Sequence, residues 1–233
     1  SNMFQEKNKA ITFSYDDGVT QDRRLIELFG RYGLKATFNL NSGLLGLRGE
    51  VPCCGTTAQH NKVQPEEVRS LYTGHEIAVH TLTHPNLTEQ TDEEIVRQVE
   101  EDRLRLSELA GYEVFGMAYP CGGVNNNDHA AQVIRERTGV KYSRTITSTH
   151  SFAPQDNLYR FNPTVYHLEW EQLFALGEQF VAMQPDTPQL FYVWGHSYEF
   201  DAHDTWGKFE EFCRLIAGHD DIFYGTNREV LGL

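Results

Sequence analysis

Short apolar runs alternate with amphipathic segments along almost the whole chain, and turn-forming residues separate them. Alternating or short continuous apolar positions predict strands, whereas apolar positions three and four residues apart predict helices. On this basis we expect strands over residues 10–15, 35–40, 75–80, 114–119, 140–146, 158–165, 189–195 and 222–224. We expect helices around 25–33, after 65, and over 91–110, 130–138, 170–183 and 206–217.

The regular order of strand and helix predicts a single α/β domain. Strands that are joined by helices become parallel, with right-handed crossovers. The simplest architecture is a barrel of about seven such units, and we assign it to residues 3–233. Ser1 and Asn2 precede the first methionine and are interpreted as a remnant of an expression vector. Residues 41–62 are rich in glycine and polar residues, and we expect a long loop there, of the kind that often covers a site.

Composition narrows the classes of partner. The chain has 33 acidic and 20 basic residues and a formal net charge of -13, which disfavours nucleic acids and anionic membrane surfaces. No stretch approaches the roughly 20 apolar residues of a membrane span. The four cysteines, at positions 53, 54, 121 and 213, form neither a disulfide framework nor a metal knuckle. We therefore expect a cytoplasmic location, although a signal peptide that has been removed would also fit the sequence.

Reactive polar groups follow four of the predicted strands, at residues 16–17, 80–84, 120–123 and 196. The carboxyl ends of parallel barrel strands meet on one face, and catalytic residues of such barrels lie there. Four separate groups at strand ends are what a single active site would produce. We therefore expect these side chains to converge.

A divalent metal ion fits part of this set. Catalytic zinc usually takes three protein ligands and keeps one position open. His80 and His84 are four residues apart, and Asp17 would supply the third ligand. Two histidines at this spacing also occur as ordinary polar side chains at the end of a strand, so the spacing alone leaves both interpretations open.

The remaining groups suit acid-base chemistry beside such an ion. Asp16 would accept a proton from water, and His196 would protonate the leaving group. The backbone N–H of Cys121, in a loop with two glycines, would stabilise a developing oxyanion. Together with a metal ion, these groups predict the hydrolysis of an amide or an ester.

Two of the motifs resemble those of the polysaccharide deacetylase family, the NodB-homology branch of the carbohydrate esterases. The family's T-F-D-D-G motif is matched with two changes by S-Y-D-D-G at residues 14–18, and its H-[ST]-x-x-H motif is matched fully by H-T-L-T-H at 80–84. The family's Leu-x-His near the end is similar to V-W-G-H at 193–196. The resemblance runs from about residue 10 to residue 196 and implies a distorted (β/α)7-type barrel.

The resemblance also implies roles for individual residues. By the match, Asp16 would be the general base, Asp17, His80 and His84 the metal ligands, and His196 the general acid. The ion would be zinc, with cobalt or nickel as alternatives. The activity implied is the removal of acetyl groups from an N-acetylated or O-acetylated carbohydrate. This carbohydrate, the substrate, would be the binding partner of the chain.

The family's third motif, R-x-P-[FY], is not matched. The corresponding residues are Ala118 and Cys121, so the arginine that orients the base and the usual aromatic residue are both absent. A backbone N–H is present whatever the side chain, so the oxyanion role of Cys121 is kept. We expect Arg144, in the strand at 140–146, to replace the missing arginine, with Arg160 as the alternative.

The surroundings of His196 are less determined by the sequence. Its acidic partner is either Glu199 or Asp201, which follow it closely. We expect the histidines at positions 60, 150, 203 and 219 to lie on the surface. Aromatic side chains at strand ends are often core residues but can also stack on a sugar, and we assign substrate binding to Tyr119, Trp194 and Tyr198.

Two alternatives to a polysaccharide deacetylase follow from the altered third motif. The same metal chemistry could act on a small amide that is not part of a polymer. The chain could also be a carbohydrate-binding protein without turnover, although a binding protein has no need of three metal ligands and two acid-base groups. The oligomeric state is left open by the sequence.

Overall fold

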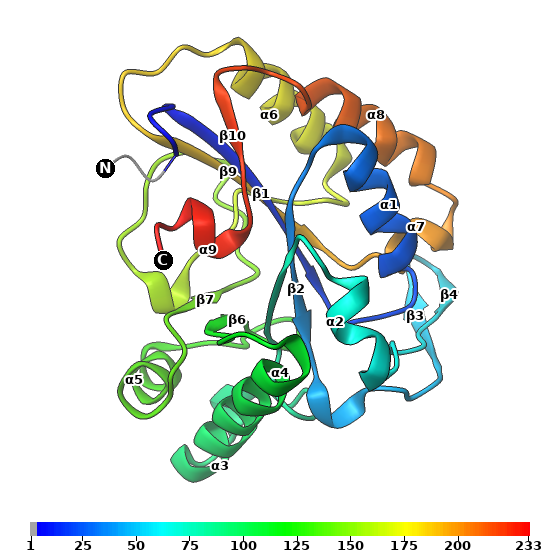
Figure 1. The fold of residues 1–233 in the computed structure, drawn as a ribbon, viewed down its shortest axis with the longest axis vertical. Coiled ribbons are helices and arrows are strands. Elements are labelled where there is room, and N and C mark those ends of the chain that lie inside the picture. Colours follow the sequence, from blue (N-terminus) through cyan, green and yellow to red (C-terminus); the bar gives the residue numbers. More distant parts are fainter. Residues whose placement is uncertain (1–3) are drawn as a thin grey trace.

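The computed structural model describes residues 4–233, and one curled sheet organises them (Figure 1). Its strands are β1 (Lys9–Asp16), β2 (Ala36–Leu40), β5 (Glu76–Val79), β6 (Gly116–Ala118), β7 (Tyr142–Arg144), β8 (Val165–Tyr166), β9 (Gln189–Gly195) and β10 (Ile222–Tyr224). The helices are α1 (Asp22–Tyr32), α2 (Val68–Leu71), α3 (Asp92–Val96), α4 (Asp102–Ala110), α5 (Asp128–Arg137), α6 (Trp170–Ala182), α7 (Glu199–Ala202), α8 (Trp206–Ile216) and α9 (Asn227–Val230).

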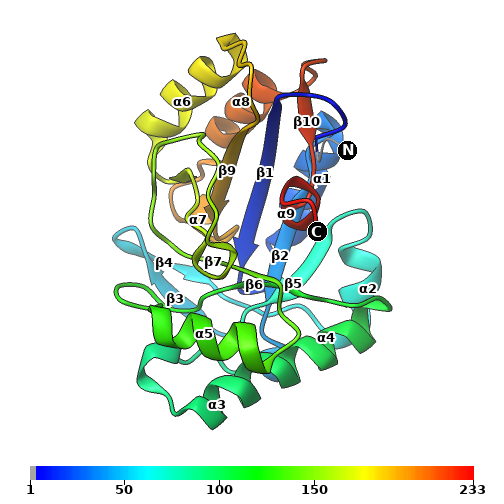
Figure 2. The ribbon, with the colours of Figure 1, turned by 90° about the vertical axis from the view of Figure 1, so that its left-hand side faces the viewer.

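All pairs in this sheet are parallel, in the order β7-β6-β5-β2-β1-β9-β8, with β10 beside β1. Strand β1 is central, and all eight of its residues are buried, as expected of a parallel strand that is covered on both faces. Helices α6, α8 and α1 lie at one end of the molecule and α3, α4 and α5 at the other, outside the curve of the sheet (Figure 2). The predicted α/β barrel of parallel strands is confirmed.

The barrel is distorted where its two outer strands approach each other. Strand β7 does not pair with β8, and a single parallel bridge joins Arg144 to Phe161 instead. The prediction of a sixth strand over 158–165 was therefore wrong. A 3₁₀ turn covers Leu158–Arg160, and only Val165 and Tyr166 pair with β9. An exposed polar segment precedes this turn, and little apolar surface is available there to extend the sheet.

Residues 41–62 do not form the unstructured loop that the composition suggests. They contain a 3₁₀ turn at Ser42–Leu44 and an antiparallel hairpin of β3 (Glu50–Cys53) and β4 (Thr56–Gln59). The buried side chains of Cys53 and Ala58 pack against Val19 and Tyr198, which anchors the hairpin beside α7. Most other positions of the hairpin are exposed, so no run of apolar residues reveals it in the sequence.

The helix predicted over 91–110 is one continuous helical segment with a wider turn inside it. Helix α3 is capped by the Thr91 side chain, which accepts a hydrogen bond from the Glu94 N–H, and Gly111 ends α4 in a left-handed conformation. Between them, Arg97–Glu101 form a π-helical turn, a feature that often marks functional sites. Ser1 and Asn2 lie outside the described residues, and their interpretation stays a prediction. Within residues 4–233, no helix is both long and apolar enough to cross a membrane.

Candidate metal centre and active site

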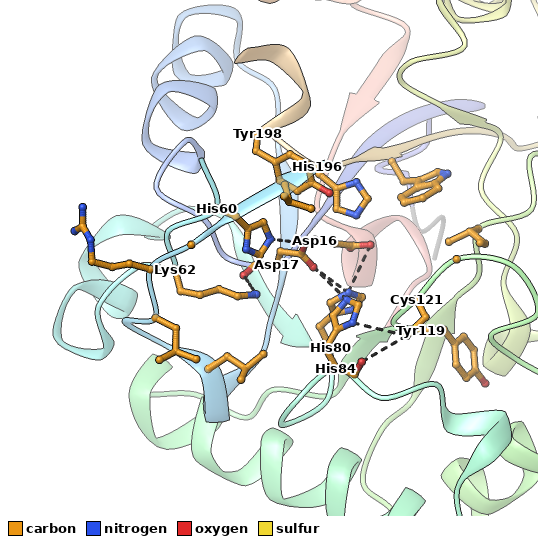
Figure 3. A pocket seen from close by; sticks show the side chains of 18 residues that line it. Asp16, Asp17, His60, Lys62, His80, His84, Tyr119, Cys121, His196 and Tyr198 are labelled. Carbon is orange, nitrogen blue, oxygen red and sulfur yellow. Dashed lines mark hydrogen bonds and ion pairs between the residues drawn. The ribbon is translucent and has the colours of Figure 1, made fainter. Parts of the chain in front are cut away.

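One cavity of about 560 Å³ opens where β1, β5, β6 and β9 end (Figure 3). The curled parallel sheet brings these strand ends together, which explains why residues far apart in the sequence meet here. Nine of the residues that the sequence singled out line it, namely Asp16, Asp17, His80, His84, Tyr119, Cys121, Trp194, His196 and Tyr198.

The three predicted metal ligands lie together. Oδ1 of Asp17 is 3.4 Å from Nε2 of His80 and 3.5 Å from Nε2 of His84, and the three ligating atoms all lie within 4.8 Å of one another. Oδ1 of Asp17 is buried and accepts no hydrogen bond from a described residue. A buried carboxylate oxygen that faces two imidazole nitrogens fits a divalent cation, which would satisfy all three atoms at once.

Hydrogen bonds from the neighbouring strand and helix hold the loop that carries His80 and His84. Nδ1 of His80 lies 2.8 Å from the Ala118 carbonyl oxygen and donates to it, which leaves Nε2 as the ligating atom. The Asp102 carboxyl group accepts hydrogen bonds from the backbone N–H groups of Ser42 and His80. In the π-helical turn, the Gln98 carbonyl oxygen accepts from the Leu82 N–H. The helix therefore fixes the loop as well as covering the sheet.

Asp16 faces the same cavity but is held by different partners. It is 2% exposed, and its two oxygens accept hydrogen bonds from Nη1 and Nη2 of Arg144 at 2.9 and 2.7 Å. Asn39 donates a third bond to Oδ1 at 2.9 Å. Burial raises the pKa of the Asp16 carboxyl group, but the Arg144 guanidinium, together with His80 and His196, more than offsets this, and the pKa lies below its ordinary value. Asp16 is therefore ionised at neutral pH.

Arg144 reaches Asp16 from the end of β7, as expected from the missing arginine of the third motif. Its side chain is fully buried, lies over the Trp194 ring at 4.6 Å, and donates to Ser14 Oγ at 2.6 Å. Arg144 is the direct register partner of Ala118, the position at which the family's arginine would stand. The alternative, Arg160, instead bonds Asn126 and Asp128 outside the cavity.

Glu199 is the acidic partner of His196. Its Oε1 is 3.1 Å from Nδ1 of His196 and also accepts the His196 backbone N–H at 2.9 Å. Burial lowers the pKa of His196, but the Glu199 carboxylate, followed by Asp17 and Asp16, raises it to about 9. The alternative partner, Asp201, bonds Gln21 and Trp206 instead.

The Glu199 carboxylate is itself held by a buried network. Nε2 of His167 lies 2.7 Å from its Oε1, and the Tyr166 hydroxyl donates to its Oε2. Tyr15, in β1, lies 3.1 Å from the other ring nitrogen of His167. Burial raises the pKa of Glu199, but the charge of His196, followed by the hydrogen bonds from His167 and His196, holds it below the ordinary value.

Cys121 lies at the edge of the cavity with its backbone in the left-handed region, at φ 77°. Its Sγ is 3.7 Å from Nδ1 of His84. Among the described residues, nothing accepts a hydrogen bond from its backbone N–H. That donor is thus available to a ligand, and its role with an oxyanion stays a prediction.

The three aromatic residues assigned to substrate binding line the cavity but are largely buried. Tyr119 is 1% exposed and donates its hydroxyl to the Tyr159 carbonyl oxygen, and Trp194 covers Arg144. Tyr198 is 8% exposed and packs its ring against His196. All three shape the cavity, and direct contact with a sugar stays a prediction.

The sequence missed two residues beside the metal centre. His60 was expected on the surface, but it lies partly buried with Nε2 3.0 Å from Oδ2 of Asp17. Lys62 is 7% exposed and donates from Nζ to the Asp17 carbonyl oxygen at 2.7 Å. Both belong to the segment that was expected to be an irregular loop, and only its pairing with distant residues places them here. No local pattern in the sequence signals that pairing.

The fold and the site define a parallel α/β barrel protein with a candidate divalent-metal centre at the carboxyl ends of its strands. The sequence profile of the family described as polysaccharide deacetylase matches residues 5–142, more than half of the chain, and the chain belongs to this family. The predicted family is thereby confirmed.

Curated proteins match part of this chain. The peptidoglycan-N-acetylglucosamine deacetylase PgdA of Listeria monocytogenes is 28% identical over 121 residues, which cover 51% of this chain and 22% of that protein. The match thus spans about a fifth of the length of these curated relatives.

Two solved structures are similar in fold. One is a family 4 carbohydrate esterase from Streptomyces lividans in complex with acetate, with 16% identity, a TM-score of 0.57 and coverage of 94% of this chain and 93% of that one. The other is a family 4 acetyl xylan esterase from Clostridium thermocellum in complex with a cobalt ion, with 14% identity, a TM-score of 0.59 and coverage of 96% and 91%. At these identities the likeness supports the distorted barrel.

Proposed function

We propose that this chain is a metal-dependent hydrolase that removes acetyl groups from an N-acetylated or O-acetylated carbohydrate. The observation that carries the proposal is that two adjacent carboxylates, Asp16 and Asp17, have different partners. Asp17 directs an unpartnered oxygen at two imidazoles, whereas Asp16 is ionised and held by Arg144. Family membership and the names of the relatives support a carbohydrate acetyl group as the target.

Asp17, His80 and His84 would hold the ion, for which zinc is the first choice and cobalt or nickel are alternatives. When bound there, a divalent ion would lower the pKa of a water molecule and polarise the acetyl carbonyl group. The neighbouring residues would supply the base, the acid and the donor to the oxyanion.

Asp16 takes the proton of the attacking water, and Arg144 keeps this base ionised and aimed at the cavity. The Cys121 N–H donates a hydrogen bond to the developing oxyanion. His196, which is protonated at neutral pH and oriented by Glu199, donates a proton to the departing amine or alcohol. Base and acid thus start in the protonation states that the reaction needs.

The metal centre is tested by elemental analysis of the purified wild type and of His80→Ala. We expect a near-stoichiometric divalent ion in the wild type and its loss in the variant, because His80 supplies one of three ligands. The loss of acetate release should exceed the roughly 10- to 100-fold cost of removing an outer-shell partner. The matched control is His150→Ala, because His150 is exposed and bonds Glu169 away from the cavity.

Two results would contradict this prediction. One is the absence of metal from the wild type even after reconstitution, and the other is acetate release by His80→Ala at the wild-type rate. A substrate panel then separates the alternatives: N-acetylglucosamine oligomers and peptidoglycan fragments against small N-acetyl amides. Sugar binding in calorimetry without any acetate release would instead favour a binding protein without turnover.

A further inference from the structure

We propose that His60 is a positioning residue that restricts Asp17 to bind the metal ion through one oxygen, Oδ1. This inference rests on the proposed metal centre and extends it to the β3–β4 hairpin. The two oxygens of Asp17 have separate partners: Oδ2 lies 3.0 Å from Nε2 of His60, and Oδ1 faces the ligand nitrogens of His80 and His84 (Figure 3). A hydrogen bond from His60 to Oδ2 opposes bidentate binding and fixes the plane of the carboxylate.

The chain holds His60 firmly in this position. The residues after β4 return beside the residues after β1, where Thr20 N–H donates to the Asn61 carbonyl oxygen at 2.8 Å and Val63 N–H donates to that of Gly18 at 2.9 Å. The backbone N–H of His60 donates to the Gly49 carbonyl oxygen at 2.8 Å. This short antiparallel bridge places residue 60 beside Asp17 through main-chain hydrogen bonds.

The His60 ring also packs within the site. Its centroid lies 5.2 Å from that of Tyr198 at an interplanar angle of 70°, an edge-to-face contact. Only 21% of the His60 side chain is exposed. The ring therefore has a defined orientation, with Nε2 directed at the carboxylate.

The same segment restrains the backbone of Asp17. Asp17 has a φ of 88°, which is uncommon for a residue with a side chain and persists only where the surroundings enforce it. Nζ of Lys62 donates to the Asp17 carbonyl oxygen at 2.7 Å and to Asn41 Oδ1 at 3.0 Å. One segment thus restrains the main chain of the ligand through Lys62 and its carboxylate through His60.

His60 acts through Asp17 and not as a fourth ligand. The group of ligating atoms within 4.8 Å of one another, searched over residues 4–233, contains Asp17, His80 and His84 but not His60. Three protein ligands leave a coordination position open for water and substrate. A carboxylate or imidazole partner outside the ligand set is the usual way to orient a ligand.

The test is Co²⁺ binding by the full chain, measured by titration against a competing chelator and by the visible absorption of the bound ion. In His60→Ala we expect the Kd to rise by about 10- to 100-fold, the typical effect of removing an outer-shell partner. The absorption spectrum should also change, because Asp17 gains freedom to bind through both oxygens. His60→Gln, whose amide can donate to Oδ2, should recover most of the affinity and the wild-type spectrum.

The matched control is His203→Ala. His203 lies 2.7 Å from the Cys54 carbonyl oxygen at the tip of the same hairpin and does not contact Asp17 in the described structure. We expect wild-type Co²⁺ affinity in this variant. An equal loss in His60→Ala and His203→Ala would assign the effect to the hairpin as a whole and overturn the specific role of His60.

Failure of this inference differs from failure of the proposed function. A wild-type protein that binds no Co²⁺ overturns the metal centre and everything that depends on it. A wild type that binds Co²⁺, with His60→Ala matching it in Kd and spectrum, overturns only the role of His60. Reduced affinity in His60→Ala with recovery in His60→Gln supports it even if the alanine variant is less stable.

Discussion

Replacing Arg144 with methionine is expected to destabilise the fold by about 3–5 kcal/mol, the usual cost of leaving one partner of a buried ion pair unpaired. Asp16 is 2% exposed and would keep only the Asn39 hydrogen bond among those that hold its carboxylate. Without the guanidinium, burial raises the pKa of Asp16, so the base is protonated over more of the neutral range. Acetate release should fall by about 100-fold or more, since general-base catalysis contributes roughly 10²–10⁴. Urea unfolding and kcat/KM measure the two effects.

A compensating double substitution tests whether the guanidinium can act on Asp16 from another position in the chain. Ala118 is the register partner of Arg144 on the neighbouring parallel strand, so both side chains point to the same face of the sheet. The double variant Ala118→Arg with Arg144→Ala moves the guanidinium to the position at which the family carries it. We expect this variant to recover part of the kcat/KM that the single Arg144→Ala variant loses.

The control for this pair is Arg160→Met, because Arg160 bonds Asn126 and Asp128 outside the cavity. It should leave kcat/KM near the wild-type value. Wild-type kcat/KM in Arg144→Met would contradict the assignment of Arg144 as the residue that orients the base.

The sequence was informative where a short motif directly follows a buried strand. Apolar residues of β1 and β5 are buried, and the polar residues after them can only face the open end of the barrel. Asp16, Asp17 and His80 were therefore located by local information. The missing arginine of the family's third motif also pointed to Arg144, although only the register of β6 and β7 explains why that position substitutes for residue 118.

The sequence was uninformative where a residue reaches the site through pairing over a long distance. His60 follows a hairpin whose residues are mostly exposed, and its approach to Asp17 depends on a bridge between residues 19 and 62. No periodicity encodes such a bridge, so the histidine was assigned to the surface. His167 is similar: the strand before it, β8, is two residues long and provides no recognisable pattern.

Replacing Glu199 with glutamine is expected to shift the alkaline limb of the kcat/KM profile to lower pH. His196 must be protonated to act as the acid, and its pKa of about 9 places the wild-type limb near that value. Glu199 is the main group that raises this pKa, followed by Asp17 and Asp16, whereas burial lowers it, so removing the charge of Glu199 lowers the pKa of His196.

The His196–Glu199 pair also contributes to the stability of the fold, and the pKa of His196 sets the direction in which this contribution changes with pH. A folded-state pKa of about 9 exceeds the unfolded value of about 6.5, so the contribution is complete below the unfolded pKa and is lost as pH rises through the folded one.

At pH 8 we expect kcat/KM of Glu199→Gln to fall by about 100-fold, within the usual range for a general acid. Asp201→Asn, whose carboxylate bonds Gln21 and Trp206, is the matched control and should keep the wild-type limb. A common alkaline limb in the wild type and Glu199→Gln would contradict the assignment of Glu199 as the main group that keeps His196 protonated as the acid.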